Sequence, residues 1–205
     1  MNMQNVNTPS PRGGIGEGVV FVFLASGFED IEALAPVDIM RRAGLQVETV
    51  SITDEIVVNS AHGVGFVADR TLAEIDFEDA DLLFLPGGLP GATNLDACQP
   101  LREGLMQHYK AGRPIAAICA APLVLGHLGI LEGKKATCYP GFETELKAAD
   151  YTASLVEQDG QFITGKGPGA AMELGYVLVE RLKDSQTATA LREGMMYNFL
   201  LMHNS

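Results

Sequence analysis

A single cysteine at the end of an apolar segment has the clearest chemical potential in this sequence. Cys119 follows residues 114–118, which have the pattern of a buried strand, and precedes a segment with the pattern of a helix. A thiol at a helix N-terminus meets free amides and the positive end of the helix dipole, which lower its pKa from about 8.5. We therefore expect Cys119 to be partly ionised and nucleophilic, on a tight turn that Ala117, Ala120 and Ala121 permit. The alternative is an inert buried cysteine.

Glu32 is the second candidate, because its spacing places a carboxyl group on the apolar face of a predicted helix. The residues at i, i+4, i+7 and i+11 of this segment are Phe28, Glu32, Ala35 and Ile39. Burial raises the pKa of a carboxyl group and a nearby thiolate raises it further, so a protonated Glu32 could donate a hydrogen bond to the sulfur. The alternative is a solvated acid in the first helical turn, which suits Glu29 and Asp30 better.

Two glycines after a third apolar segment complete the predicted site. Gly87 and Gly88 follow residues 81–85 and Pro86. Glycine lets the backbone approach a ligand closely, so their amides, with that of Ala120, are candidates for holding a developing oxyanion. The alternative is a simple left-handed turn.

No metal or nucleotide site is predicted. The four histidines, at positions 62, 108, 127 and 203, lack the sequence spacing of metal ligands, and we expect most of them to be structural. His127 lies two helical turns after Cys119, too far along the helix to deprotonate it. The glycines of residues 165–169 lack the pattern and the preceding strand of a dinucleotide-binding loop.

The elements that must position these residues alternate between strand and helix. Strands are expected at residues 19–25, 45–52, 81–85, 114–118 and 136–138. Helices are expected at residues 28–43 and 100–111, from Cys119 to near 129, at 142–148, from 169 to about 183, and at 187–202. Hairpins are expected at residues 56–68 and 154–164. In the last helix, the residues expected to share a face are Leu191, Met195, Phe199 and Met202.

This alternation predicts an α/β fold with a mostly parallel sheet and helices on both faces. Ligands bind such sheets beyond the carboxyl ends of the strands. Residues 25–32, 86–88 and 119–122 should therefore converge at one edge of the sheet.

The composition narrows the class of protein. The 205 residues are 47% hydrophobic and 20% charged, as expected of one globular domain, and the net charge of −12 disfavours nucleic acid and anionic membranes as partners. The longest early apolar run has about seven residues, far fewer than a membrane helix needs. Three widely spaced cysteines favour reduced thiols and a cytoplasmic location. Residues 1–18 resemble a disordered leader and not a signal peptide, and residues 19–202 form the expected domain.

Several motifs together resemble the ThiJ/PfpI superfamily, most closely its Parkinson-associated protein deglycase branch. The segments that carry the resemblance are residues 25–32, 36–44, 85–88, 116–122 and 165–169. The resemblance implies a flavodoxin-like three-layer sandwich, a homodimer, and a reactive Cys119 that is hydrogen-bonded to Glu32 and oxidises to a sulfinic acid. It also implies a cofactor-free activity on methylglyoxal, or on glycated amines and thiols. A redox sensor with little turnover is the alternative function, and a holdase is a third.

Departures from the family pattern narrow these functions. Ala120 stands where the peptidase branch has a histidine, and no His-x-Glu sequence follows Cys119, so neither a protease nor a glutamine amidotransferase is expected. Tyr139 occupies a position where some deglycase-branch members have a histidine near the thiol, and Lys166 one where relatives have arginine. Glu29, Tyr139 and Lys166 are the candidates for lining the substrate pocket.

Overall fold

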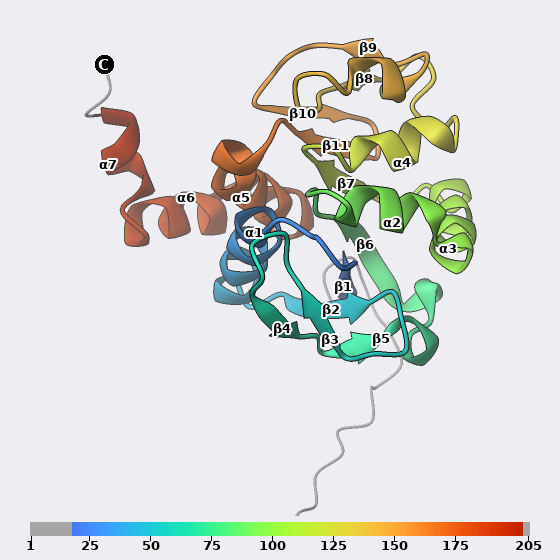
Figure 1. Cartoon of the computed structure of the whole chain (residues 1–205). Helices are drawn as coiled ribbons and strands as arrows, with labels where there is room; N and C mark the ends of the chain where they lie inside the picture. Colours follow the sequence, from blue (N-terminus) through green and yellow to red (C-terminus); the bar gives the residue numbers. More distant parts are fainter. Residues whose placement is uncertain (1–17, 203–205) are drawn as a thin grey trace, which may run out of the picture.

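A seven-stranded sheet forms the centre of the computed structural model, which describes residues 18–202 (Figure 1). In spatial order its strands are β10 (Val156–Asp159), β11 (Phe162–Gly165), β7 (Ile115–Ile118), β6 (Ala80–Leu85), β1 (Val19–Leu24), β2 (Gln46–Ser51) and β5 (Arg70–Thr71). Neighbouring strands are parallel except for the hairpin of β10 and β11. The predicted α/β class and the predicted central strands are confirmed.

Helices cover both faces of this sheet, which explains the uninterrupted apolar runs. All six residues of β1 are buried, as expected of a strand covered on both sides. One face packs against α1 (Asp30–Arg42) and α5 (Ala171–Leu182). The other packs against α2 (Gly91–Ala97), α3 (Gln99–Lys110) and α4 (Pro122–His127) (Figure 1). The result is the expected three-layer sandwich in a single domain.

Short elements complete the fold. The predicted hairpin near residue 60 consists of β3 (Val57–Asn59) and β4 (Gly65–Val67), a separate antiparallel pair. A second small pair, β8 (Lys135–Ala136) and β9 (Asp150–Tyr151), is parallel. The four 3₁₀ turns are η1 (Leu72–Glu74), η2 (Phe77–Asp79), η3 (Glu143–Leu146) and η4 (Pro168–Ala170). The predicted helix at 142–148 is thus one short turn.

The end of the chain differs from the prediction. The single helix expected at 187–202 is two helices, α6 (Ser185–Gly194) and α7 (Tyr197–Met202). Met196, between them, has a φ of 60°, a left-handed conformation that ends α6 and redirects the backbone. The expected common face is therefore interrupted: Met195 packs against the core, whereas Phe199 is 57% exposed. Figure 1 shows α6 and α7 leading away from α5.

The predicted leader at residues 1–18 lies outside the described residues except for Gly18, whose amide donates to Asp81 at 2.9 Å. Among the described helices, none combines the length and the apolar character that a bilayer crossing requires.

Candidate active site

The loops that follow β1, β6 and β7 meet at the carboxyl edge of the sheet, as predicted, and the end of β11 joins them there. The Glu29 amide donates to the Gly87 carbonyl at 3.0 Å, joining the loops after β1 and β6. Because Ile118 lies opposite Gly165 in the β7–β11 pair, the Cys119 amide donates to the Gly165 carbonyl at 2.9 Å. Strand ends far apart in sequence thus surround one cysteine.

Cys119 occupies the strained turn that its small neighbours predict. Its φ is 64°, a left-handed conformation that costs a residue with a side chain about 1 to 2 kcal/mol. The turn lies between β7 and α4, and the side chain is only 8% exposed. The elbow is therefore present, but the cysteine is largely buried.

The Glu32 carboxyl group is fully buried beside this thiol. It lies in the first turn of α1, on the face predicted from helical spacing. Its Oε2 accepts the Gly87 amide at 3.0 Å. Oε1 is buried without a nitrogen or oxygen partner among the described residues, and the carboxyl faces the Cys119 thiol. The two side chains are therefore placed to exchange a proton.

Burial determines the acid–base properties of this pair. Desolvation raises the Glu32 pKa to about 7, although the hydrogen bonds from Cys119 and Gly87 oppose the shift and the charge of Glu29 supports it. Burial likewise raises the pKa of Cys119, and the charge of the facing Glu32 raises it further. The amides of Ala120 and Gly88 act in the opposite direction.

The expectation of a lowered thiol pKa is therefore wrong for the pair at rest. The helix N-terminus and its amides are present, but desolvation and a facing carboxylate outweigh them. The site is better described as a thiol and a carboxylate that share one proton near neutral pH. Glu32 is thus suited to accept the thiol proton when the sulfur reacts.

The two glycines have different roles. A methyl group at Gly87 would overlap Glu32 Oε2 and the Cβ of Cys119, so only glycine permits this approach. Because the Gly87 amide already donates to Glu32, it is not free to hold an oxyanion. The Gly88 and Ala120 amides face the sulfur and remain available. The predicted set of amide donors is therefore reduced to these two.

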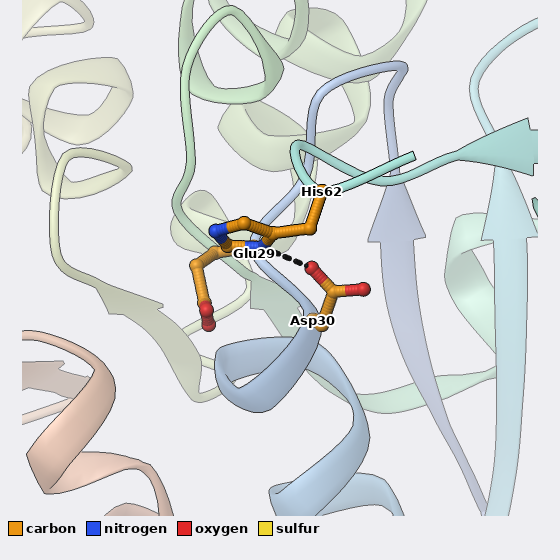
Figure 2. Close-up of side chains that lie close together, drawn as sticks. All are labelled: Glu29, Asp30 and His62. Atoms are coloured by element: carbon orange, nitrogen blue, oxygen red, sulfur yellow. Dashed lines mark hydrogen bonds and ion pairs between the residues drawn. The ribbon is translucent and has the colours of Figure 1, made fainter. Parts of the chain in front are cut away.

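Two acidic residues and a histidine that is distant from them in the sequence lie together at the start of α1 (Figure 2). Glu29 caps α1 by accepting the Glu32 amide at 2.8 Å, and His62 Nδ1 lies 2.7 Å from Asp30 Oδ2. Glu29, Asp30 and His62 each have a side-chain atom that could bind a metal ion, and these atoms lie within 4.8 Å of one another. His62 arrives because the Ala61 amide of the β3–β4 hairpin donates to the Phe28 carbonyl at 2.7 Å. Nothing in the local sequence around His62 indicates this pairing.

The two remaining pocket candidates are placed differently from each other. The Tyr139 amide donates to the Cys119 carbonyl at 2.8 Å, and its half-exposed ring lies over Gly167. Lys166 follows β11, but its Nζ donates to the Ala153 carbonyl at 3.0 Å. Tyr139 is therefore attached to the cysteine turn, whereas the Lys166 ammonium is held by the backbone of a neighbouring loop.

The other cysteines and histidines that the structure describes lie outside this site. Cys138 is buried and Cys98 is partly exposed, and both are free thiols. His108 is buried and lies 3.0 Å from the Pro114 carbonyl through Nε2. His127 contacts Asp96 and Glu145, as expected of a residue that does not act on Cys119.

Comparison with known proteins adds to this geometry. The sequence profile of the DJ-1/PfpI family matches residues 19–181. Protein DJ-1 homolog B of Arabidopsis thaliana is 43% identical over 82% of this chain, and the Parkinson disease protein 7 homolog of Danio rerio is 35% identical over 83% of it. Glutathione-independent glyoxalase DJR-1.2 of Caenorhabditis elegans is 33% identical over 80% of it. The chain spans only 39% of the length of Arabidopsis homolog B and 44% of that of Arabidopsis homolog A. It spans 93% of the Danio protein and 87% of the Caenorhabditis protein.

Solved structures show the same fold. A mutant of a DJ-1 superfamily protein from Salmonella typhimurium has a TM-score of 0.83 and 34% identity, covering 87% of this chain and 98% of its own. Toxoplasma gondii DJ-1, in an oxidized form, has a TM-score of 0.84 and 33% identity over the same shares.

Proposed function

Since this chain belongs to the DJ-1/PfpI family, we propose that it is a cofactor-independent enzyme of the glyoxalase or deglycase type. Its substrates would be α-oxoaldehydes such as methylglyoxal, or their adducts with amines and thiols. The observation that carries this proposal is the Cys119–Glu32 pair, in which a recessed thiol meets a buried carboxyl group with a pKa of about 7. The relative named a glutathione-independent glyoxalase supports the same reaction class.

In the proposed mechanism, Glu32 accepts the Cys119 proton as the sulfur adds to the aldehyde carbon of methylglyoxal. The carbonyl π electrons move to oxygen, and the Gly88 and Ala120 amides stabilise the resulting oxyanion until Glu32 returns the proton to it, which gives a hemithioacetal and restores the Glu32 carboxylate. Glu32 then transfers the proton of this carbon to the neighbouring carbonyl carbon by way of an enediol, giving a lactoyl thioester. Water hydrolyses the thioester, which releases lactate and restores the thiol.

Lactate formation by the wild type and by Cys119→Ser tests this proposal. We expect turnover by the wild type and none by the serine variant, while Cys98→Ser, which changes a cysteine outside the site, behaves as wild type. Wild-type turnover below about 0.01 per second, against the usual enzymatic range of about 1 to 1000 per second, would exclude the enzyme proposal.

A redox sensor is the second candidate function. The oxidized form of the Toxoplasma relative favours it, because the fold tolerates an oxidised state in that protein. Here the Cys119 thiolate would attack peroxide to give a sulfenic acid and water, and a second peroxide would give the sulfinic acid. Intact mass after peroxide titration should show two added oxygen atoms in the wild type and none in Cys119→Ser. Fast oxidation without lactate formation would favour the sensor.

A further inference from the structure

A second titratable cluster lies at the opposite end of α4 from Cys119. His127 is the last residue of α4, and its ring lies between two carboxylates. Nδ1 is 2.7 Å from Asp96 Oδ2, and Nε2 is 2.8 Å from Glu145 Oε2. Because Asp96 belongs to α2 and Glu145 to η3, this one ring connects three elements.

Only one charge state of the ring satisfies both contacts. A neutral imidazole has a single N–H, so it donates to one carboxylate and turns a lone pair toward the other. An imidazolium donates from both nitrogens. The geometry is therefore that of the charged ring, and the hydrogen bonds that the ring donates to Glu145 and Asp96 raise the His127 pKa accordingly.

The elements packed around His127 contribute further charged side chains to this cluster. Arg102 of α3 hydrogen-bonds to Asp96, and Lys147, just after η3, donates to Glu145 at 3.2 Å. Glu132, in the turn after α4, lines the same hollow as His127 and Lys147. Each carboxylate beside the ring thus also contacts an arginine or a lysine side chain, and histidine is the residue type of this cluster whose ionisation changes at mild pH.

Each of the three connected elements follows a segment of the Cys119 site. Helix α2 comes after Gly88, α4 after Cys119, and η3 after Tyr139, whose amide donates to the Cys119 carbonyl. The contact between α4 and η3 is tight, because a methyl group at Gly126 would overlap the Glu145 carbonyl. Short, packed elements therefore connect His127 with the segments around the thiol.

We propose that the His127 imidazolium is a positioning residue, which holds the three segments around Cys119 together and whose deprotonation loosens them. The proposal rests on Cys119 being the reacting group of the proposed function, but not on the identity of its substrate. The folded-state pKa of His127 is raised, so the stabilisation is complete below about pH 6.5 and is lost as the pH rises through the folded value. Loosening hydrates the thiol and so favours its ionisation.

Nitrogen-detected NMR titration of the His127 ring is the first test. We expect both ring nitrogens to remain protonated above pH 6.5. A ring that loses its proton at or below about pH 6.5 would overturn the proposal.

Amide exchange at Tyr139, expressed as a protection factor at pH 6 and pH 9, is the second test. In the wild type, the protection factor should be about tenfold lower at pH 9 than at pH 6, which is the size expected for losing one charge-assisted hydrogen bond. In Glu145→Gln it should not fall, because the glutamine amide donates to the neutral Nε2 while Nδ1–H still donates to Asp96. In His127→Ala it should be low at both pH values. Lys147→Gln, the matched control, removes a Glu145 partner that does not contact His127 and should behave as wild type.

The rate of Cys119 alkylation by iodoacetamide links this cluster to the site. At pH 6, the wild type and Glu145→Gln should be alkylated at about the same rate. At pH 9, the wild type should react about three times faster than the variant, since loosening of the segments around Cys119 favours the thiolate. An equal ratio of the two rates at both pH values would contradict the proposal. None of these measurements requires turnover, so a failed glyoxalase assay leaves their interpretation unchanged.

Discussion

At the scale of single residues, the proposed chemistry depends on one proton shared by Cys119 and Glu32. Burial raises the pKa of both groups. The charge of Glu32 raises the Cys119 pKa further, whereas the hydrogen bond from Cys119 opposes the rise at Glu32. Titration therefore belongs to the pair and not to either side chain alone. In the proposed mechanism, Glu32, with a pKa of about 7, takes the role that a histidine has in many cysteine enzymes.

Glu32→Gln separates the two effects of this carboxyl group. Removing the facing charge should lower the Cys119 pKa by at least about one unit, measured by thiolate absorbance against Cys119→Ser. Removing the base should at the same time lower lactate formation about 100-fold or more, although more thiolate is present. Wild-type activity should rise with pH through about 7 as Glu32 ionises.

Asp38→Asn provides the control, because it removes an exposed charge from the same helix. It should leave both the thiol pKa and the activity unchanged. An unaltered thiol pKa in Glu32→Gln would show that the two side chains do not interact.

Residue patterns predicted this pair but not its electrostatics. Helical spacing placed Glu32 on the buried face, and the small residues around Cys119 indicated the turn. The direction of the thiol pKa was wrong because it depends on burial depth and on a charge 87 positions away in the chain, which no local pattern contains. His62 was missed for a similar reason, since a hairpin brings it to Asp30.

At the scale of elements, apolar runs identified the strands well and the short helices poorly. Strands covered on both faces have an unbroken apolar sequence, as β1 and β6 do. Helix α2 was not predicted, because only Gly91, Ala92 and Leu95 of its seven residues are buried. The break at Met196 depends on one backbone angle of a residue other than glycine, although Gly194, the last residue of α6, lies just before it.

His108 on α3 makes the stability of the fold dependent on pH. Its Nε2 contacts the Pro114 carbonyl, its Nδ1 is buried without a partner within residues 18–202, and burial lowers its pKa to about 4. The unfolded chain therefore binds more protons between about pH 4 and 6.5, so this contribution is complete above pH 6.5 and is lost as the pH falls. We expect a loss of about 3 kcal/mol by pH 4 in urea unfolding.

His108→Gln isolates this contribution, because glutamine can still donate to the carbonyl but does not titrate. The unfolding free energy of the wild type should fall relative to that of the variant as the pH falls from 7 to 4. A constant difference over that range would contradict the prediction.

At the scale of the whole molecule, exposed apolar side chains gather near the start of α1. Ile31 is 53% exposed, and on the adjoining hairpin Val57, Val64 and Val67 are 52%, 52% and 65% exposed. Single exposed apolar residues are common, but a group on adjoining elements indicates an interface. We expect the predicted homodimer to form through this surface and not through α7.

Val67→Asp should convert the dimer to a monomer in light scattering coupled to size-exclusion chromatography, because it places a charge in the interface. Phe199→Asp is the matched control on α7, where the wild-type side chain is 57% exposed. A dimer that survives Val67→Asp and dissociates with Phe199→Asp would place the interface on α7 instead.

The low exposure of Cys119 has a consequence for its reactivity. Because only 8% of this residue is exposed, we expect its sulfur to react faster with small reagents than with bulky ones. Unfolding separates Cys119 from Glu32 and leaves a cysteine with an ordinary pKa of about 8.5, open to any electrophile. Bulky thiol reagents should therefore distinguish folded from damaged molecules, and the cysteine can report on the integrity of its own fold.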